Sequence, residues 1–539
     1  MSGHELTSRE PTDDELPPEA AATAAGEGVS QGGAPARHGV RRLSGSARLW
    51  LLIFGGSLVL LLVRFLVPSP VGQADNHDGH RLMCRLGVRA VVPHGYARFY
   101  SYAYFSYGPI HGLPRCPVYP SSQLVLLELA KLLTPVLGLP GTLNLIALGV
   151  LTCVIISFGI ASLATGLRLR KWAQLVIAAC VWLVMADATF FDVYASPFGE
   201  PAALIGILLI AAGVVYVGRG RRETVFGLVL TGSGGLLAAL AKEQYLVLAV
   251  PVCLTLLLVG VARGGGRGLE RVRLRHAGAA VAVAGLVGGL TAAYWFWDST
   301  NPYAAQLHHE QAIDMIFRDI VNGHDNARAD LRALGLPASW ARYAGGYTWS
   351  HPSPRNDPLY HRYEAKLSES NIAHFLLTHP SRIITVGQRA AGYAQQFRVT
   401  YLGNYEPGAG HPPGALESRV AVITWLMRQL PPGLGLLWLI PVWVFMAGVA
   451  ITTLFLRRGD TWHRDGAVLV LCLTGCAVVA FIPAAYFAGL TIARHMTGMN
   501  LATALAFPVS AALGVSLGYQ LLAPRWRRPG PAGPSQAHR

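Results

Sequence analysis

Long apolar runs, repeated along most of the chain, constrain its fold more than any other feature. Many of these runs are roughly 17 to 23 residues long, enough for a helix to cross a hydrocarbon layer of about 30 Å. Hydrophobic residues make up 52% of the 539 residues and charged residues only 14%, which excludes an ordinary soluble enzyme. Hydropathy therefore predicts an all-α polytopic membrane protein with about ten transmembrane helices. The predicted spans are 49–67, 143–163, 172–185, 201–217, 225–240, 245–261, 279–297, 434–456, 466–487 and 501–522.

The basic residues indicate how these spans are oriented. The net charge of +15 could suggest a nucleic-acid partner, but the Arg and Lys residues gather in short clusters between alternate apolar runs. Basic loops of this kind lie on the cytoplasmic side of membrane proteins. Both termini are therefore predicted to be cytoplasmic, the segment after the first span is predicted to be extracytoplasmic, and no nucleic-acid partner is expected. The clusters lie at 168–171, 219–222, 263–275, 457–458 and 525–528.

The spans divide the chain into five predicted parts. Residues 1–45 and 524–539 read as disordered cytoplasmic tails, because the first has almost no large apolar groups and the second is rich in Pro and Gly. Residues 46–297 form an N-terminal transmembrane module, whose outer loop (74–141) should contain a surface helix near 122–133. Residues 298–431 form a mostly helical extracytoplasmic domain, and residues 432–523 the C-terminal transmembrane helices.

A dense polar cluster follows directly on the first span. It contains Asp75, Asp78 and Arg81, with two histidines among them. Polar residues packed beside a hydrophobic span more often mark a site than a spacer, although a solvated loop is the plainer interpretation. In the same loop, Cys84 and Cys116 could form a disulfide if the loop faces an oxidising compartment.

Three further polar clusters fall on the same predicted side of the membrane, and residues that share a membrane depth can build one pocket. In the second cluster, Asp192 is predicted to support the site or bind a substrate hydroxyl, whereas Glu200 precedes Pro201 at a helix start. Lys242 and Glu243 are adjacent in the third, so their partners are expected elsewhere. The fourth cluster is Arg494-His495, whose Arg could snorkel or bind a lipid phosphate.

The order and sidedness of these clusters resemble the GT-C superfamily of polytopic membrane glycosyltransferases, with bacterial glycan-biosynthesis hexose transferases as the nearest group. The resemblance covers residues 48–528. It is carried by the acidic pair Asp75 and Asp78, the surface helix in the first outer loop, the Glu200-Pro201 helix start, His379-Pro380 before a second surface helix, and Arg494 before the last span. The Asp-x-x-Asp spacing departs from the tighter acidic pairs of several branches, which leaves open which Asp is the base.

The resemblance implies an inverting hexosyl or pentosyl transfer from a polyprenyl-phosphate sugar to a cell-envelope glycan or lipid-linked acceptor at the outer face of the bacterial cytoplasmic membrane. Asp75, the nearer to the membrane, would be the general base, and the other Asp could orient the acceptor or help hold Mg²⁺ or Mn²⁺. Arg494, His495 and Lys242 would stabilise the departing phosphate. Asp192, Glu200, Glu243 and Arg81 would bind substrate.

The function, and the role of the aromatic residues in the outer segment, each have alternative interpretations. A transporter or flippase for a lipid-linked precursor is the main alternative function, although such proteins place charges at mid-membrane and show two similar halves. A membrane scaffold with an outer binding domain is the third possible function. The aromatic residues Trp340, Tyr343, Tyr347 and Trp349 in the outer segment would bind sugar faces or form that domain's core.

Overall fold

A computed structural model describes residues 45–92, 99–110, 116, 119–262, 304–322, 326–457, 460–489 and 492–522, with isolated residues between 280 and 291. This part of the chain is predominantly helical, and the prediction of an all-α polytopic membrane protein is confirmed. Five of its helices are long and apolar enough to span a membrane, or six if one bent pair counts as a span. The predicted tails, apart from Gly45, and most of the predicted span 279–297 lie outside the described residues.

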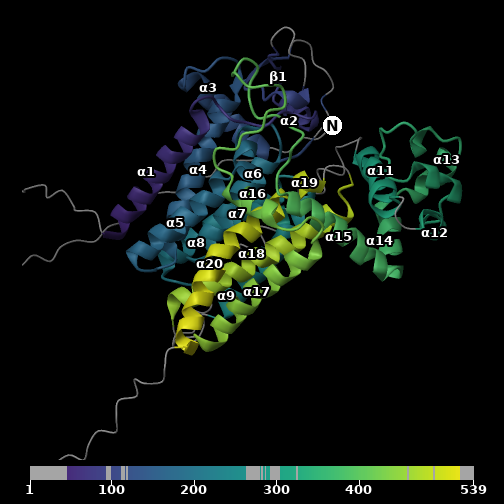
Figure 1. The fold of residues 1–539 in the computed structure, drawn as a ribbon. Helices are drawn as coiled ribbons and strands as arrows, with labels where there is room; N and C mark the ends of the chain where they lie inside the picture. The colour runs from purple at the N-terminus through teal and green to yellow at the C-terminus, as the bar shows by residue number, and fades with distance from the viewer. Residues whose placement is uncertain are drawn as a thin grey trace, which may run out of the picture. The chain divides into compact units, whose positions relative to one another are not determined.

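Nine of the predicted apolar runs fold as helices, but not all of them have the length of a membrane span. Helix α7 has 15 residues and is therefore only about 23 Å long. All of its residues are buried, because it packs among α4, α8, α18 and α20 (Figure 1). The described membrane helices are α1 (Gly45–Leu66), α4 (Leu145–Gly166), α5 (Lys171–Ala186), α6 (Ala188–Phe191), α7 (Glu200–Val214), α8 (Arg221–Ala239), α9 (Ala249–Ala262), α17 (Leu436–Leu456), α18 (Thr461–Tyr486) and α20 (Thr497–Leu522), with 3₁₀ turns η2 (Asp192–Ala195) and η3 (Glu243–Leu248) and the short α19 (Ile492–His495).

Helices α7 and α8 touch through their backbones along a glycine seam, formed by Gly206, Gly213, Gly227 and Gly234. A Cβ atom on Gly206 would lie 2.5 Å from the Gly234 carbonyl oxygen, and one on Gly213 would lie 2.7 Å from that of Gly227. Small residues at a helix interface let two membrane helices approach this closely. The seam therefore fixes the register of α7 against α8.

Helix α5 ends at a sharp break. The chain turns by 55° between α5 and the following α6–η2 segment. Asp187 lies at the break, where it accepts hydrogen bonds from the Thr189 amide at 3.1 Å, the Thr424 hydroxyl at 2.7 Å and the Ile423 amide at 2.8 Å. A buried carboxylate with several donors is well satisfied, so Asp187 ties the break to the distant helix α16 (Val422–Gln429).

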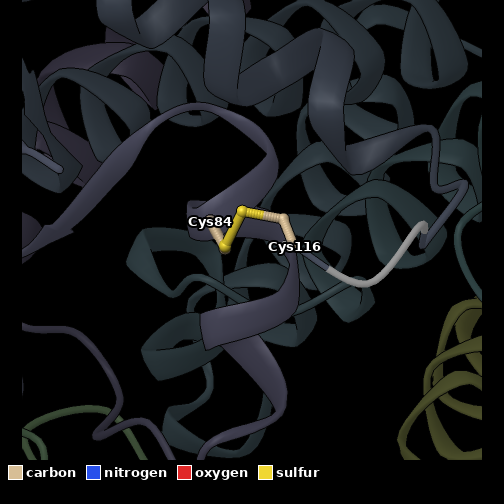
Figure 2. Close-up of a disulfide and its surroundings, with 2 residues drawn as sticks. All are labelled: Cys84 and Cys116. Atoms are coloured by element: carbon tan, nitrogen blue, oxygen red, sulfur yellow. A yellow bond between two sulfur atoms is a disulfide. The ribbon is translucent and has the colours of Figure 1, made fainter. Parts of the chain in front are cut away.

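The loop after α1 contains a small antiparallel sheet, which the sequence analysis did not predict. Strands β1 (Val88–Ala90), β2 (Ser106–Pro109) and β3 (Leu143–Asn144) pair in that order. Helix α2 (Asp78–Arg85) precedes the sheet, and α3 (Gln123–Val136) is the predicted surface helix. Figure 2 shows the disulfide that joins Cys84 in α2 to Cys116, a pairing that the sequence allowed.

A second hydrophobic core lies within residues 312–386, inside the predicted polar region. We call residues 304–322 and 326–396 the polar module. Trp340 and Tyr343 are buried in its core, and His379 separates the helices at 369–378 and 380–396. The elements of the module are α11 (Ala304–Asp314), the π-helix η4 (Met315–Ile320), α12 (Ala327–Ala333), η5 (Ala338–Tyr343), η6 (Pro354–Asn356), α13 (Tyr360–Tyr363), η7 (Glu364–Lys366), α14 (Glu369–Thr378) and α15 (Pro380–Gln396).

Candidate functional site

Four polar clusters that are far apart in the sequence meet at one end of the helix bundle. The first follows the end of α1, the second begins α7, the third follows the end of α8, and the fourth precedes α20. Helix α7 packs against α8, α20 and α4, and α4 packs against α1, so the four chain segments belong to one bundle and arrive at the same end of it. We call the side chains that meet there, Asn76, Asp78, Glu200, Lys242 and Arg494, the Arg494 cluster.

Arg494 is the centre of this cluster and is only 2% exposed. Its guanidinium donates to the Asp78 carboxylate and, at 3.0 Å, to the Asn76 side-chain oxygen. Its Nε lies 3.2 Å from Glu200 Oε1, and the Phe198 ring lies under the guanidinium carbon at 4.8 Å. The planar group is therefore held in one orientation by contacts along its edges and on a face.

Glu200 also approaches Lys242, whose Nζ lies 3.4 Å from Glu200 Oε1. Their chain segments are in backbone contact just before these residues, since a Cβ atom on Gly199 would lie 2.5 Å from the Ala241 carbonyl oxygen. Ser121, next to α3, donates to the same carbonyl at 2.7 Å. Two carboxylates, Asp78 and Glu200, thus face two cations, and the buried charges balance, as they must where solvation is poor.

The two candidate bases lie in different surroundings. Burial by itself would raise the pKa of Asp78, but the charges of Arg494 and Lys242 and the hydrogen bond from Arg494 outweigh it and hold that pKa well below its usual range. Burial raises the pKa of Asp75, only partly offset by the hydrogen bond from the Gly79 amide at 2.9 Å. Asp75 is therefore the better proton acceptor near neutral pH.

Arg81 differs from the other cations of this face. It lies on α2, and its charge acts on Asp78 and Glu243. Among the described residues, its half-buried guanidinium has no hydrogen-bond or ion-pair partner within the distances that define such contacts. Its planar fork of donors is therefore available for an anionic ligand.

The residues next to Lys242 and Arg494 pair with each other. Gln244 and His495 are hydrogen-bonded through their side chains, and Gln244 also donates to the His495 carbonyl at 3.3 Å. Burial, followed by the charges of Lys242 and Arg494, lowers the pKa of His495 well below its usual value. A neutral imidazole cannot supply the positive charge that the sequence analysis expected of it.

Glu243 points toward the polar module instead of the Arg494 cluster. Its Oε2 lies 3.8 Å from Nε2 of His308 on α11, and Nδ1 of His308 is 2.9 Å from Glu369 at the start of α14. Burial raises the pKa of Glu243, and the nearby His308 lowers it in part. Glu243 therefore joins the site to the module.

Asp75 and Asp78 do not fit the predicted divalent-cation site. No group of three His, Cys, Asp or Glu side chains that could hold a metal ion occurs within the described ranges. In addition, the Asp78 carboxylate is bonded to Arg494, whose positive charge opposes a cation there.

The structure separates the two roles expected of Asp192 and favours the supporting one. It is 2% exposed and bonds to Arg398 at 2.6 Å. Arg398 also donates to the Asn404 side-chain oxygen at 2.8 Å, and Asn404 donates to the Gly72 carbonyl at 2.8 Å. Asp192 is thus a buried structural residue near the chain segment before Asp75, and its bonded carboxylate is not open to a substrate hydroxyl.

Two polar contacts were missed by the sequence analysis. Asn76 stands inside the first cluster and contacts Arg494 directly. Arg64 lies in the first apolar run and forms a buried ion pair with Glu417. A charged residue inside an apolar run is a signal in itself, so Arg64 could have been identified, whereas nothing in the local pattern distinguishes Asn76.

Comparison with known proteins gives one family match. The model of the family described as the YfdI N-terminal transmembrane domain matches residues 38–508. No curated protein gives a significant sequence match. The family match covers all the residues of the Arg494 cluster and also Asp75 and Arg81.

Proposed function

Since the chain belongs to the family of the YfdI N-terminal transmembrane domain, a family of multi-pass membrane proteins, we propose that it is a membrane glycosyltransferase of the GT-C type. It moves a hexose or pentose from a polyprenyl-phosphate donor to a cell-envelope glycan. The observation that carries the proposal is the convergence of four distant polar segments at one end of an apolar bundle. A charge-balanced cluster lies there, together with Asp75, which accepts a hydrogen bond from a backbone amide, and Arg81, which has no ion-pair partner among the described residues.

The helix directions support a site on the extracytoplasmic face. Glu200 begins α7, whereas the basic residues Arg219 to Arg222 follow its end. Likewise, α4 ends just before the basic stretch 168–171. Basic connections are cytoplasmic in bacterial membrane proteins, so the opposite helix ends, where the Arg494 cluster lies, face outward and both termini face the cytoplasm.

Asp75 is the proposed general base. It takes the proton of the acceptor hydroxyl while that oxygen bonds to the anomeric carbon of the donor sugar. The bond from the anomeric carbon to the phosphate oxygen breaks at the same time, and its electron pair leaves with the lipid phosphate. The raised pKa of Asp75 and the depressed pKa of Asp78 favour this assignment of the two carboxylates.

Arg81 is the proposed ligand of the donor phosphate. Arg494 and Lys242 already face carboxylates, so an added phosphate next to them would meet a neutral cluster. Arg81 supplies a surplus charge and a bidentate fork, the geometry that suits a phosphate. Arg494 then acts as a positioning residue that holds Asp78 and Glu200, and no metal ion is assigned a role.

The test is a transfer assay in membranes with radiolabelled polyprenyl-phosphate hexoses and pentoses and extracted envelope glycan. Label should reach the glycan with the wild type, and Asp75→Asn should abolish transfer at equal protein level. Arg81→Gln should raise the KM for the donor. Glu364→Gln, an exposed carboxylate of the polar module, is the matched control and should transfer normally.

Two outcomes would change the proposal. Normal transfer by Asp75→Asn together with none by Asp78→Asn would move the base to Asp78. No transfer by the wild type with any donor would overturn the enzyme, and movement of a lipid-linked precursor across vesicles would then support a transporter.

A further inference from the structure

An exposed tryptophan stands on the polar module. Four aromatic residues of this segment were candidates for sugar contacts, and the structure separates them. Trp340 and Tyr343 are buried in the module's core. Trp349 is 59% exposed, and Tyr347 beside it is 36% exposed. Trp349 and Tyr347 therefore lie at the surface of the module, where their rings are accessible to a ligand.

The chain around Trp349 is held rigidly by side-chain hydrogen bonds. Asp314 accepts from both the amide and the hydroxyl of Thr348, at 2.6 and 2.7 Å. Ser350 accepts from the Tyr347 amide at 3.1 Å and donates to the Tyr347 carbonyl at 2.7 Å. Both neighbours of Trp349 in the sequence therefore have side-chain hydrogen bonds that position the backbone at Trp349, which lowers the entropy cost of binding a ligand there.

A guanidinium lies over this ring and is linked to a carboxylate and an amide. The Arg355 guanidinium carbon lies 5.0 Å from the ring centroid, and its Nη1 is 3.2 Å from the Glu310 carboxylate. Gln306 donates to the same carboxylate at 2.9 Å. Arg355 is the only ring partner recorded for Trp349 among the described residues.

We infer that Trp349, Tyr347, Arg355, Glu310 and Gln306 form a carbohydrate-binding surface. The face of an aromatic ring carries partial negative charge, which attracts the C–H groups on the apolar side of a pyranose. Fixed guanidinium, carboxylate and amide groups next to the ring can hydrogen-bond the sugar hydroxyls. A lipid surface fits less well, because Arg355 is paired with Glu310 and so offers no net positive charge to anionic headgroups. That the bound glycan is the acceptor rests on the proposed function.

The test measures binding separately from transfer. The probe is a fluorescent end-labelled oligosaccharide released by mild acid from the envelope glycan of the source cells, titrated with full-length protein in nanodiscs and followed by anisotropy. Trp349→Ala should weaken binding about tenfold, which is a change of about 1.4 kcal/mol, and Trp349→Phe should weaken it less. Trp425→Ala is the matched control, since Trp425 is also 59% exposed but lies on α16.

Each outcome bears on the inference. Binding by the wild type and Asp75→Asn alike, lost only in Trp349→Ala, supports it even if no transfer is found. No binding by the wild type, equal binding by Trp349→Ala, or an equal loss in Trp425→Ala would overturn it, while a positive transfer assay would leave the proposed function in place. Thermal unfolding of each variant shows whether a loss of binding reflects a loss of folding.

Discussion

Arg494→Gln should destabilise the fold far more than a comparable change at an exposed ion pair. The substitution keeps most of the side-chain stem and removes the charge, so it leaves Asp78 and Glu200 facing Lys242 alone. Removing one partner of a buried ion pair costs about 3–5 kcal/mol. Because the Asp78 side chain is 42% exposed, water partly solvates its charge, and we expect the lower end, about 3 kcal/mol.

Arg168→Gln provides the matched comparison. Arg168 donates from Nη2 to both carboxylate oxygens of Glu223, at 2.9 and 2.8 Å. These side chains are 48% and 40% exposed, however, and exposed pairs contribute only about 0–1 kcal/mol. The measurement is unfolding in mixed detergent micelles, where the midpoints report the difference in free energy of unfolding.

A double mutant tests the cause. Asp78→Asn added to Arg494→Gln removes an uncompensated carboxylate, so the two changes together should cost less than their sum, by about 0.5–3 kcal/mol. Equal losses from Arg494→Gln and Arg168→Gln, or strict additivity with Asp78→Asn, would refute the reasoning that burial makes the Arg494 cluster strong.

Three other variants probe the loop that carries the site. Gly79→Ala would place a Cβ 2.5 Å from a proline ring and 3.1 Å from the Asp75 carboxyl carbon, so transfer activity should fall. The control Gly392→Ala on α15 has open space around it and should increase the free energy of unfolding by up to about 1 kcal/mol. The electrostatic interaction with His77 lowers the pKa of Asp75, so that pKa should rise in His77→Asn. Since transfer needs ionised Asp75, the acid limb of the pH–rate profile should move to higher pH. Cys84→Ser opens a disulfide that joins residues 32 apart and should cost about 3–4 kcal/mol in the same unfolding assay.

A different result would contradict each of these three predictions. Normal transfer by Gly79→Ala would show that the loop adapts without moving the base. An acid limb that stays in place or moves to lower pH in His77→Asn would indicate a base other than Asp75. An unchanged midpoint for Cys84→Ser, with the disulfide verified in the wild type by thiol labelling, would show that the loop is ordered without it.

The sequence predicts at which membrane face the site residues lie, but not which charged side chains pair with each other. Alternating spans place the four clusters at one membrane face, which is why Asp78, Glu200, Lys242 and Arg494 could be grouped. The partner of Asp192 is Arg398, 206 residues away, and no local pattern encodes that contact. Trp340 and Trp349 lie in one irregular segment without a helical or strand period, so only the folded chain separates the buried ring from the exposed one.

The glycine seam between α7 and α8 has a mechanical consequence. The backbones of α7 and α8 are in contact at Gly206–Gly234 and at Gly213–Gly227, so they would collide if either helix slid or rotated. The two helices therefore move as one rigid pair. Glu200 at the start of α7 and Lys242 just past α8 lie at the same end of this rigid helix pair. Any opening or closing around a substrate must therefore come from the other contributors, α2 with Asp78 and Arg81, and the α19 segment with Arg494.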